Sequence, residues 1–232
     1  MSNYWRDLWN EVSTDTDLQS QVGRTVRKQP VSDDLFLKTV DWVAEEMQLN
    51  EASSVLELCC GNGVWTLPLS KRVKQITAVD FSKPLLGVLA AELARQNITN
   101  VTVKMEDVVA MALDGHPPYT HVFLYFALQH FSERETVLLF EKAHALLKHT
   151  GGMFYIGGIP DRLKLWDFAN TREYEKIYFD EVKHETPSIG TWFIQEDLVR
   201  LADYAGFSSC ERIALPGWQM NSHFRFDLKL QV

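Results

Sequence analysis

The chain has 232 residues, of which 46% are hydrophobic and 12% aromatic, enough apolar material to bury a large core and too much for a disordered protein. Its 23 basic and 31 acidic residues give a net charge of −8 with no run of Lys and Arg, which argues against a nucleic-acid partner. No stretch approaches the roughly 20 apolar residues that span a bilayer, and Met1–Asn10 has no apolar run behind a basic start. We therefore expect neither a membrane anchor nor export.

Three cysteines, two of them adjacent at Cys59 and Cys60, provide neither the spacing of a disulfide framework nor paired metal-ligand spacing with His. A reducing, cytoplasmic setting without a structural metal fits this pattern. We find no internal repeat, low-complexity tract or long linker, so we expect one domain, as a monomer or homodimer.

The N-terminal segment, Met1–Leu49, does not share the alternating pattern that follows and predicts two or three helices. We interpret residues 1–50 as a helical cap. From Val55 onward, short apolar runs alternate with longer amphipathic ones, which predicts a parallel sheet covered by helices on both faces.

The first two strands are each followed by a helix signal. Ser53–Leu58 reads as a buried strand because its apolar run stops at a Cys-Cys-Gly-Asn-Gly turn. A helix should begin near Val64 and run towards Lys71, with Pro68 tolerated only in its first turn. Gln75–Val79 predicts the second strand, and Ser82 with Pro84 predicts the start of a helix over Pro84–Gln96.

Further strands and helices complete the pattern. The predicted strands are Val101–Met105, His121–Phe126, Gly152–Gly157, Phe207–Leu215 and Ser222–Leu230, and the predicted helices are Glu133–Lys148 and Glu196–Ala205. The last strand alternates apolar and polar residues with period two, which is typical of an antiparallel strand with one buried face. The aromatic and polar segment Asp161–Lys183 interrupts the pattern and predicts a lid insertion over residues 161–190.

These elements predict an α/β fold with a Rossmann-like, doubly wound sheet of seven strands, mostly parallel with the last strand antiparallel. The core would occupy residues 51–232. In such a sheet, ligands bind outside the carboxyl ends of the strands.

Polar and acidic residues follow the first two predicted strands at that edge. The turn from Glu57 to Trp65 contains Cys59, Gly61, Asn62 and Gly63, and its glycines allow the backbone to approach a ligand at a helix N-terminus. Such a turn by itself is a weak signal, because tight turns also use glycine for conformational reasons alone. Asp80 ends the second strand, where its carboxylate would accept both hydroxyls of a ribose.

Glu106, Asp107 and Val108 follow the third strand at the same edge of the sheet. A carboxylate or a backbone amide there would bind the amine edge of an adenine ring. Three strand ends thus converge on one nucleoside-containing cofactor.

The run Leu56-Glu57-Leu58-Cys59-Cys60-Gly61-Asn62-Gly63 resembles the first motif of the class I S-adenosylmethionine-dependent methyltransferases, in particular those of quinone biosynthesis. The resemblance spans roughly Asp34–Pro160. Cys59 stands where the family usually has glycine, so the backbone of this turn should have a narrower range of allowed conformations.

The resemblance implies a role for each matched residue. Glu57 and the backbone from Cys59 to Gly63, with Trp65 in the same turn, would hold the methionine moiety, and Asp80 would bind the ribose. Phe81 would lie against the adenine, and Asp107 would bond the adenine amine. The cofactor would be S-adenosylmethionine, with S-adenosylhomocysteine as product.

The segment after the fourth sheet strand resembles the family's methyl-acceptor region. Phe126 would lie beside the cofactor, and Gln129 and His130 would be polar members of the acceptor pocket. His130 is the candidate general base for a hydroxyl acceptor, since the ordinary histidine pKa lies near neutrality. A structural histidine bonded to a backbone carbonyl is the alternative.

Two more sets of residues lie outside the motifs. Arg24 would pair with the methionine carboxylate from the N-terminal segment, or would be a solvated surface arginine. Trp166, Tyr178 and Trp192 would line the acceptor pocket, although aromatic residues in such a segment more often pack a helix.

The predicted reaction is in-line transfer of a methyl group to oxygen or nitrogen of a small-molecule acceptor, such as a metabolite, a sugar or a natural-product intermediate. A nicotinamide-dependent oxidoreductase fits less well, because Thr66 stands where its fingerprint needs a small residue. A binding protein that keeps the nucleoside site without catalysis is the second alternative.

Overall fold

The computed structural model describes residues 3–26 and 29–232. Parts of the predicted N-terminal segment, residues 1, 2, 27 and 28, lie outside this range. The described residues form a seven-stranded sheet in the order β5-β4-β3-β6-β7-β9-β8, together with a two-stranded hairpin. The sheet strands are β3 (Ser54–Leu58), β4 (Gln75–Asp80), β5 (Val101–Met105), β6 (His121–Tyr125), β7 (Met153–Pro160), β8 (Ser209–Ala214) and β9 (Arg225–Gln231).

Only β9 runs against its neighbours in the seven-stranded sheet. β3, β4, β5, β6 and β7 pair in parallel, whereas β9 is antiparallel to both β7 and β8. This confirms the predicted topology. Because β9 is reversed, its first residue, Arg225, lies at the edge where the parallel strands end, opposite Pro160 of β7.

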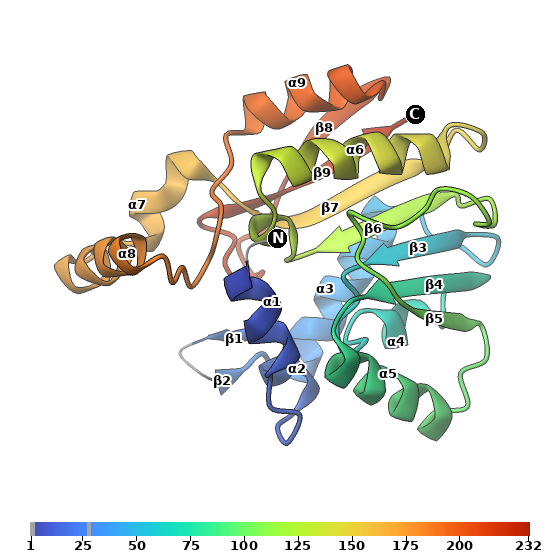
Figure 1. Ribbon diagram of the computed structural model, residues 1–232, viewed down its shortest axis with the longest axis horizontal. Helices are drawn as coiled ribbons and strands as arrows, with labels where there is room; N and C mark the ends of the chain where they lie inside the picture. Colours follow the sequence, from blue (N-terminus) through green and yellow to red (C-terminus); the bar gives the residue numbers. More distant parts are fainter. Residues whose placement is uncertain (1–2, 27–28) are drawn as a thin grey trace.

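Helices cover both faces of the sheet (Figure 1). One face packs against α3 (Asp33–Glu46), α4 (Thr66–Leu69) and α5 (Lys83–Arg95), and the other against α6 (Glu133–Leu147) and α9 (Gln195–Ala205). α3 buries Phe36, Val40 and Val43 in the core, so this part of the N-terminal segment belongs to the helical layer on the sheet. The division into a cap over residues 1–50 and a core stays a prediction.

Local signals set the helix ends. Ser82 accepts the amide of Leu85 at the start of α5, and Ser132 forms a capping box with Glu135 at the start of α6. α4 is shorter than predicted: it has one turn and does not reach Lys71. The amide of Lys74 already bonds to the carbonyl of Ser53, so the chain has turned back towards the sheet by that point.

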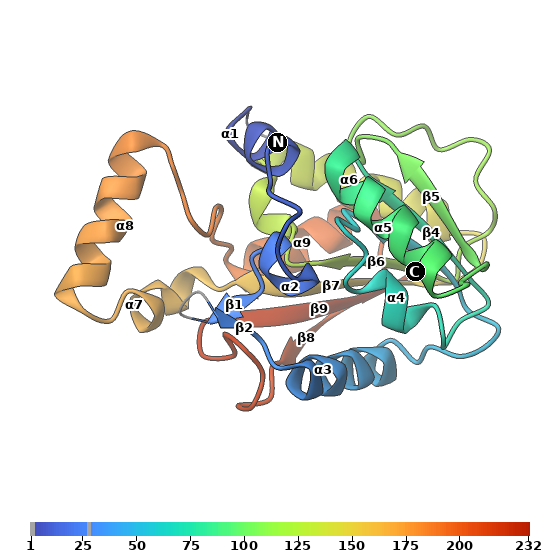
Figure 2. The ribbon, with the colours of Figure 1, turned by 90° about the horizontal axis from the view of Figure 1, so that it is seen from below.

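The remaining N-terminal elements cross the carboxyl edge of the sheet (Figures 1 and 2). They are α1 (Asn3–Asn10), α2 (Leu18–Gln21) and the hairpin of β1 (Thr25–Val26) and β2 (Gln29–Pro30). Ser82 Oγ donates to the carbonyl of Trp9 at 2.6 Å, and Asn62 Nδ2 donates to the carbonyl of Leu18 at 2.7 Å. These bonds tie α1 and α2 to the segments that follow β4 and β3.

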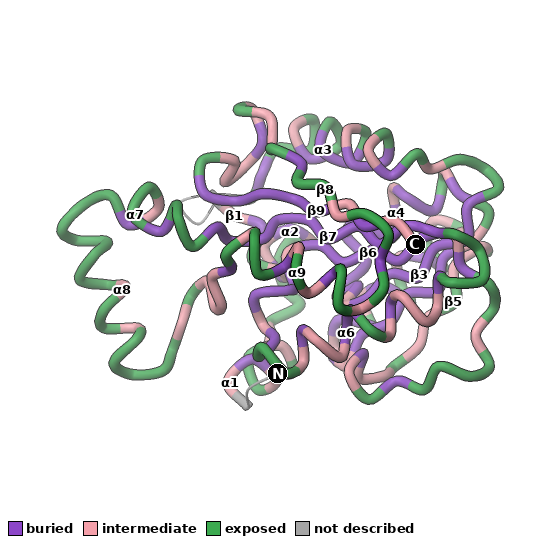
Figure 3. Tube along the Cα trace, turned by 90° about the horizontal axis from the view of Figure 1, so that it is seen from above, coloured by how far each residue is buried: buried purple, intermediate pink, exposed green. Residues whose placement is uncertain are grey.

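A helical excursion after β7 stands away from the body of the molecule (Figures 1 and 2). It comprises a single 3-10 turn over Arg162–Lys164, α7 (Leu165–Phe168) and α8 (Arg172–His184). No residue of α8 is buried, and Figure 3 shows the helix as largely exposed. The lid role predicted for residues 161–190 stays a prediction. Among the described residues, no helix has the length and hydrophobicity needed to cross a membrane.

Candidate functional site

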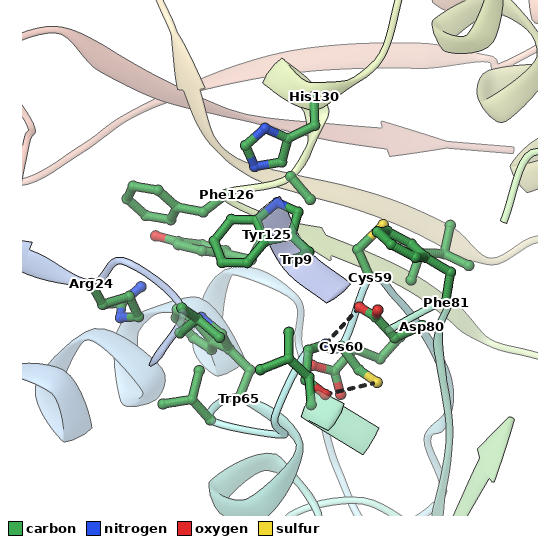
Figure 4. A pocket seen from close by; sticks show the side chains of 17 residues that line it. Trp9, Arg24, Cys59, Cys60, Trp65, Asp80, Phe81, Tyr125, Phe126 and His130 are labelled. Carbon is green, nitrogen blue, oxygen red and sulfur yellow. Dashed lines mark hydrogen bonds between the residues drawn. The ribbon is translucent and has the colours of Figure 1, made fainter. Parts of the chain in front are cut away.

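A cavity with about 700 Å³ of empty space opens where β3, β4 and β6 end (Figure 4). Its walls come from the last residues of these three strands and the segments after them, from α1 and α5, and from the loop after α2. The lining residues are Trp9, Val22, Arg24, Glu57, Leu58, Cys59, Cys60, Gly61, Val64, Trp65, Asp80, Phe81, Leu85, Tyr125, Phe126, Ala127 and His130.

The turn after β3 bends tightly under the cavity. Cys59, Gly61 and Gly63 have φ angles of +56°, +55° and +80°, so Cys59 adopts the left-handed conformation that favours glycine. A side chain at Gly63 would meet Leu89, because a Cβ there would lie 2.2 Å from Leu89 Cδ1. The turn therefore depends on the absence of a side chain at Gly63.

Asp80 holds this turn from the neighbouring strand. Its Oδ2 accepts the amide of Gly61 at 2.9 Å, and its Oδ1 accepts the amide of Ser82 at 2.8 Å. Burial raises the pKa of Asp80, and these backbone bonds oppose the rise. Each carboxylate oxygen keeps a second lone pair, so the carboxylate can accept further hydrogen bonds from a ligand in the cavity.

Glu57 is a second acid on the cavity wall and is almost fully buried. Its Oε2 accepts the hydroxyl of Thr66 at 2.7 Å. Burial raises the pKa of Glu57 to about 8, with a smaller contribution from the charge of Asp80. In the absence of a cationic ligand, Glu57 is therefore mainly protonated at neutral pH.

Arg24 brings a buried positive charge to the same cavity. Its guanidinium carbon lies 4.8 Å, 5.2 Å and 5.3 Å from the ring centres of Phe36, Trp65 and Phe126. Burial lowers the pKa of Arg24 to about 10, so the group stays charged at neutral pH. Among the described residues, no acceptor bonds its buried Nε or Nη1. Buried charges are normally paired, so these atoms indicate an anionic ligand group.

His130 lines the cavity, and its role as a general base stays a prediction. Burial and the nearby positive charge of Arg225 lower the pKa of His130 to about 3, far from neutrality. Its ring lies 4.1 Å from the ring of Trp5 and 5.7 Å from that of Trp9. Its Nδ1 is buried and has no partner among the described residues. His130 is thus a neutral imidazole with one ring nitrogen available to a ligand.

The residues after β5 lie at the carboxyl edge of the sheet, as predicted, but they do not line the cavity. Asp107 forms an ion pair with Arg6 of α1 and accepts the amide of Val109 at 2.9 Å. Glu106 lies 4.0 Å from the ammonium group of Lys104, and Val108 is buried in the core. β5 is the edge strand, one position beyond β4, and this places all three residues outside the cavity wall.

Three other predicted contacts also lie away from the cavity wall. Asn62 is buried beneath the turn, where its side-chain amide bonds Leu18 and Gln21 of α2. Gln129 is buried and donates to the carbonyl of Phe126 at 2.9 Å. These two residues, like Gly63, fix the shape of the walls and do not face the space.

The structure does not bring the predicted aromatic residues of the insertion to this cavity. Tyr178 and Trp192 line a second hollow of about 380 Å³ beside α8. Trp166 is about half exposed and lies against Tyr178 and Phe179. A role for these residues in binding the acceptor stays a prediction.

Sequence reasoning missed several cavity residues, chiefly Trp9, Val22 and Leu85. Trp5 and Trp9 are four residues apart and therefore share one face of α1, a spacing that indicates a buried face. That spacing does not reveal which surface the helix covers. Arg225 was also missed, because it lies at the start of a strand that reads as a sheet element.

The fold and the cavity together define a class of protein. A sheet in the order β5-β4-β3-β6-β7-β9-β8 with β9 reversed, and acids from β3 and β4 beside one cavity, is the arrangement of the class I S-adenosylmethionine-dependent methyltransferases. A solved S-adenosylmethionine-dependent methyltransferase from Clostridium acetobutylicum has this fold, with a TM-score of 0.67 and 12% identity over 92% of this chain and 97% of that chain.

Sequence comparisons agree with this class. Residues 55–151 match the family described as methyltransferase domain. A demethylmenaquinone methyltransferase from Shouchella clausii is 29% identical over 40% of this chain and 41% of its own length. A tRNA/tmRNA (uracil-C(5))-methyltransferase from Pseudomonas fluorescens is 36% identical over 28% of this chain and 18% of its own length. The chain thus spans less than half the length of these two relatives. Residues 55–151 thus match a methyltransferase domain, and the chain has the fold of a solved S-adenosylmethionine-dependent methyltransferase.

Proposed function

We propose that this chain transfers the methyl group of S-adenosylmethionine to oxygen or nitrogen of a small-molecule acceptor and releases S-adenosylhomocysteine. The observation that supports this most directly is the charge pattern of the cavity. Asp80 lies on one side and the unpaired guanidinium of Arg24 on the other, with aromatic side chains between them (Figure 4). A cofactor with a ribose at one end and an amino-acid carboxylate at the other suits that pattern.

The residues present fit this cofactor. In the proposed arrangement, Asp80 accepts the ribose hydroxyls, Phe81 lies against the adenine, and Arg24 pairs with the methionine carboxylate. Glu57 and the backbone of the turn after β3 hold the methionine ammonium and chain. Asp107 does not line the cavity, so it would bond the adenine amine only if the adenine extended past the cavity wall. Glu106 and Val108 do not contact the cofactor in this arrangement.

When bound, S-adenosylmethionine supplies a methyl group on a sulfonium, whose leaving group is a neutral thioether. The protein's contribution is to position the acceptor and to exclude water. Phe126, Tyr125 and His130 form the wall beyond the turn, and Trp5 and Trp9 cover His130 from α1. His130 bonds the acceptor as a neutral imidazole through Nδ1, and proton removal by this residue is not required.

A small-molecule acceptor is supported by the net charge of −8 and by the partly enclosed aromatic walls. One of the relatives reported above acts on tRNA and tmRNA, as its name states, so RNA belongs among the acceptors to test. We also infer that the protein works in the cytoplasm as a monomer or homodimer.

Calorimetry with S-adenosylhomocysteine and with NAD tests the cofactor. We expect binding of S-adenosylhomocysteine and no binding of NAD, and the reverse result would support an oxidoreductase. Transfer of labelled methyl from S-adenosylmethionine to a panel of phenols, amines, sugars and total tRNA tests the activity. Cofactor binding without transfer to any of these would favour a nucleoside-binding scaffold, and transfer to tRNA alone would replace the small-molecule acceptor.

A further inference from the structure

Arg225 is a second buried arginine at the carboxyl edge of the sheet. It is the first residue of β9 and is only 5% exposed. Its Nη1 donates to the carbonyl of Gly158, and the Oε1 of Gln129 lies 3.5 Å from the same nitrogen. Its Nε is buried without a partner among the described residues. The guanidinium is therefore only partly satisfied within the fold.

No carboxylate in the described part of the chain forms an ion pair with Arg225. Asp227, the nearest acid in sequence, bonds other groups: Oδ2 accepts the Tyr155 hydroxyl and Oδ1 accepts the Gly158 amide, each at 2.6 Å. Its charge raises the pKa of Arg225 against a larger lowering by burial, without a hydrogen bond between the two side chains. Burial raises the pKa of Asp227 to about 7, so this acid is only partly ionised at neutral pH. Arg225 thus has a partly ionised acid nearby but no ion-pair partner among the described residues.

The two unpaired guanidiniums lie on the same aromatic ring. The centre of the Phe126 ring is 5.3 Å from the guanidinium carbon of Arg24 and 4.6 Å from that of Arg225. Phe126 has a φ angle of +56°, a conformation that is uncommon for a bulky residue. Two buried cations without ion pairs therefore flank one wall residue of the cavity.

Arg225 lines neither hollow itself, but it contacts a wall residue of the first and a neighbour of the second. The wall residue is Phe126, which lines the cofactor cavity. The neighbour is Phe224, whose ring centre is 5.1 Å from the guanidinium carbon and which contacts Phe168 and Trp192. These last two residues line the second hollow. A ligand group bound by Arg225 would lie near both the proposed methyl donor and this aromatic region.

After the cofactor is placed, Arg225 is a buried cation that still lacks an ion-pair partner in the described part of the chain. S-adenosylmethionine has one carboxylate, and in the proposed arrangement it pairs with Arg24. Its ammonium and sulfonium give the cofactor a net positive charge, so its arrival does not neutralise Arg225. A buried cation of this kind is stabilised by an anion that comes with the other reactant.

We propose that the methyl acceptor is a small acid whose carboxylate is bound by Arg225, with the Nε of Arg225 donating to it. This inference rests on the proposed function and narrows its acceptor to carboxylate-bearing molecules. Carboxylate recognition by a guanidinium is strong and directional, because both groups are planar and the bonds are charge-assisted. Arg225 then determines substrate class, and His130 and Phe126 lie beside the acceptor.

A purely structural role for Arg225 is the competing explanation. Gly158 is held at both of its backbone polar groups, by Asp227 at its amide and by Arg225 at its carbonyl, and it has a φ angle of +69°. If Arg225 only fixes this bend of β7, its replacement lowers stability and does not change the preference between an acid and a neutral analogue. The two roles are therefore separable by measuring that preference.

The test uses the protein saturated with S-adenosylhomocysteine and two matched pairs of probes, para-hydroxybenzoate with para-hydroxybenzamide and indole-3-acetate with indole-3-acetamide. Calorimetry gives the dissociation constant of each probe. We expect at least one acid to bind about tenfold or more tightly than its amide. In R225Q this preference should fall below about threefold, and R225K should retain part of it. R212Q, on the neighbouring strand β8, should keep the full preference.

Several results would overturn the proposal. They are equal binding of acid and amide by the wild-type protein, no binding of either acid to the loaded protein, and an unchanged preference in R225Q. If R225Q does not fold, the preference for acid over amide in the wild-type protein and in R225K still tests the proposal. Failure of S-adenosylhomocysteine to bind the wild-type protein would instead contradict the proposed function, so the two failures are distinct.

Discussion

Arg6 of α1 forms an ion pair with Asp107, which follows β5 and lies 101 residues later in the chain. The Arg6 guanidinium carbon is also 5.5 Å from the ring centre of Phe81, the residue directly after β4. One side chain thus connects the first helix to the ends of two strands. Together with the hydrogen bond from Ser82 to the carbonyl of Trp9, this connection holds Trp5 and Trp9 against His130 on the side of α1.

Arg6→Ala should therefore release α1 with little loss of global stability. The ion pair is partly exposed, and such pairs contribute about 0–1 kcal/mol. We expect the melting temperature to change by a few degrees at most, and limited proteolysis to cut within residues 3–10 faster than in the wild-type protein. Arg95→Ala removes a comparable ion pair within α5 and is the control. Equal cleavage rates in the two variants would show that Arg6 does not hold α1.

Asp80→Asn should weaken cofactor binding strongly. The variant loses the charge, and its side-chain amide cannot accept from both Gly61 and Ser82 as the carboxylate does. Hydrogen bonds to a charged group contribute about 1.5–3 kcal/mol, so we expect binding of S-adenosylhomocysteine to weaken by about tenfold or more in calorimetry.

Glu106→Gln is the matched control for that experiment. It removes a carboxylate at the same edge of the sheet that does not line the cavity, so affinity should change by less than about twofold. If both variants weaken binding equally, the carboxylate of Asp80 has no special role.

Glu57→Gln should change how stability depends on pH. Burial raises the pKa of folded Glu57 to about 8 from an ordinary 4.5, so between these values the unfolded chain ionises while the folded protein keeps its proton. The contribution of Glu57 to the free energy of unfolding is therefore fully present below about pH 4.5. It is lost as the pH rises towards and through 8, by up to about 1.4 kcal/mol per pH unit. Gln removes this dependence and still accepts the Thr66 hydroxyl.

The difference in melting temperature between Glu57→Gln and the wild-type protein should therefore grow in favour of the variant from pH 5 to pH 8. Thermal unfolding at each pH unit measures it, with Glu51→Gln at an exposed position as control. The same variant should bind S-adenosylhomocysteine more weakly, because the ligand ammonium loses its partner. Parallel pH curves for variant and wild-type protein would contradict the raised pKa.

Gly63→Ala and Gly87→Ala should have opposite effects on stability. At Gly63 the φ angle is +80° and a Cβ would lie 2.2 Å from Leu89 Cδ1, so we expect a loss of about 2 kcal/mol or more. Gly87 lies within α5 with open space around it, and alanine there should stabilise the helix by about 0.5–1 kcal/mol. Chemical unfolding measures both changes. A neutral Gly63→Ala would mean that the turn after β3 relaxes easily.

The sequence was sufficient to predict the sheet and the acids at two of its strand ends. β5 occupies the predicted residues, and β3, β4 and β6 agree within one residue. Their apolar runs and turn signals are local, and the rule that ligands bind at the carboxyl ends of parallel strands placed Glu57 and Asp80 correctly beside one cavity. The reversed direction of β9 followed from its period-two pattern.

Only the tertiary structure decided what surrounds those residues, because contacts between distant segments leave no local pattern in the chain. His130 has a pKa of about 3 because α1 and Arg225 meet around it, and Asp107 is paired because Arg6 reaches it from the first helix. Arg24 and Arg225, 201 residues apart in the chain, contact the same ring of Phe126 only after the sheet has formed and β9 has returned to its carboxyl edge. Composition and periodicity fix which segments become strands and helices, whereas the charge and burial of a site depend on which segments the fold brings together.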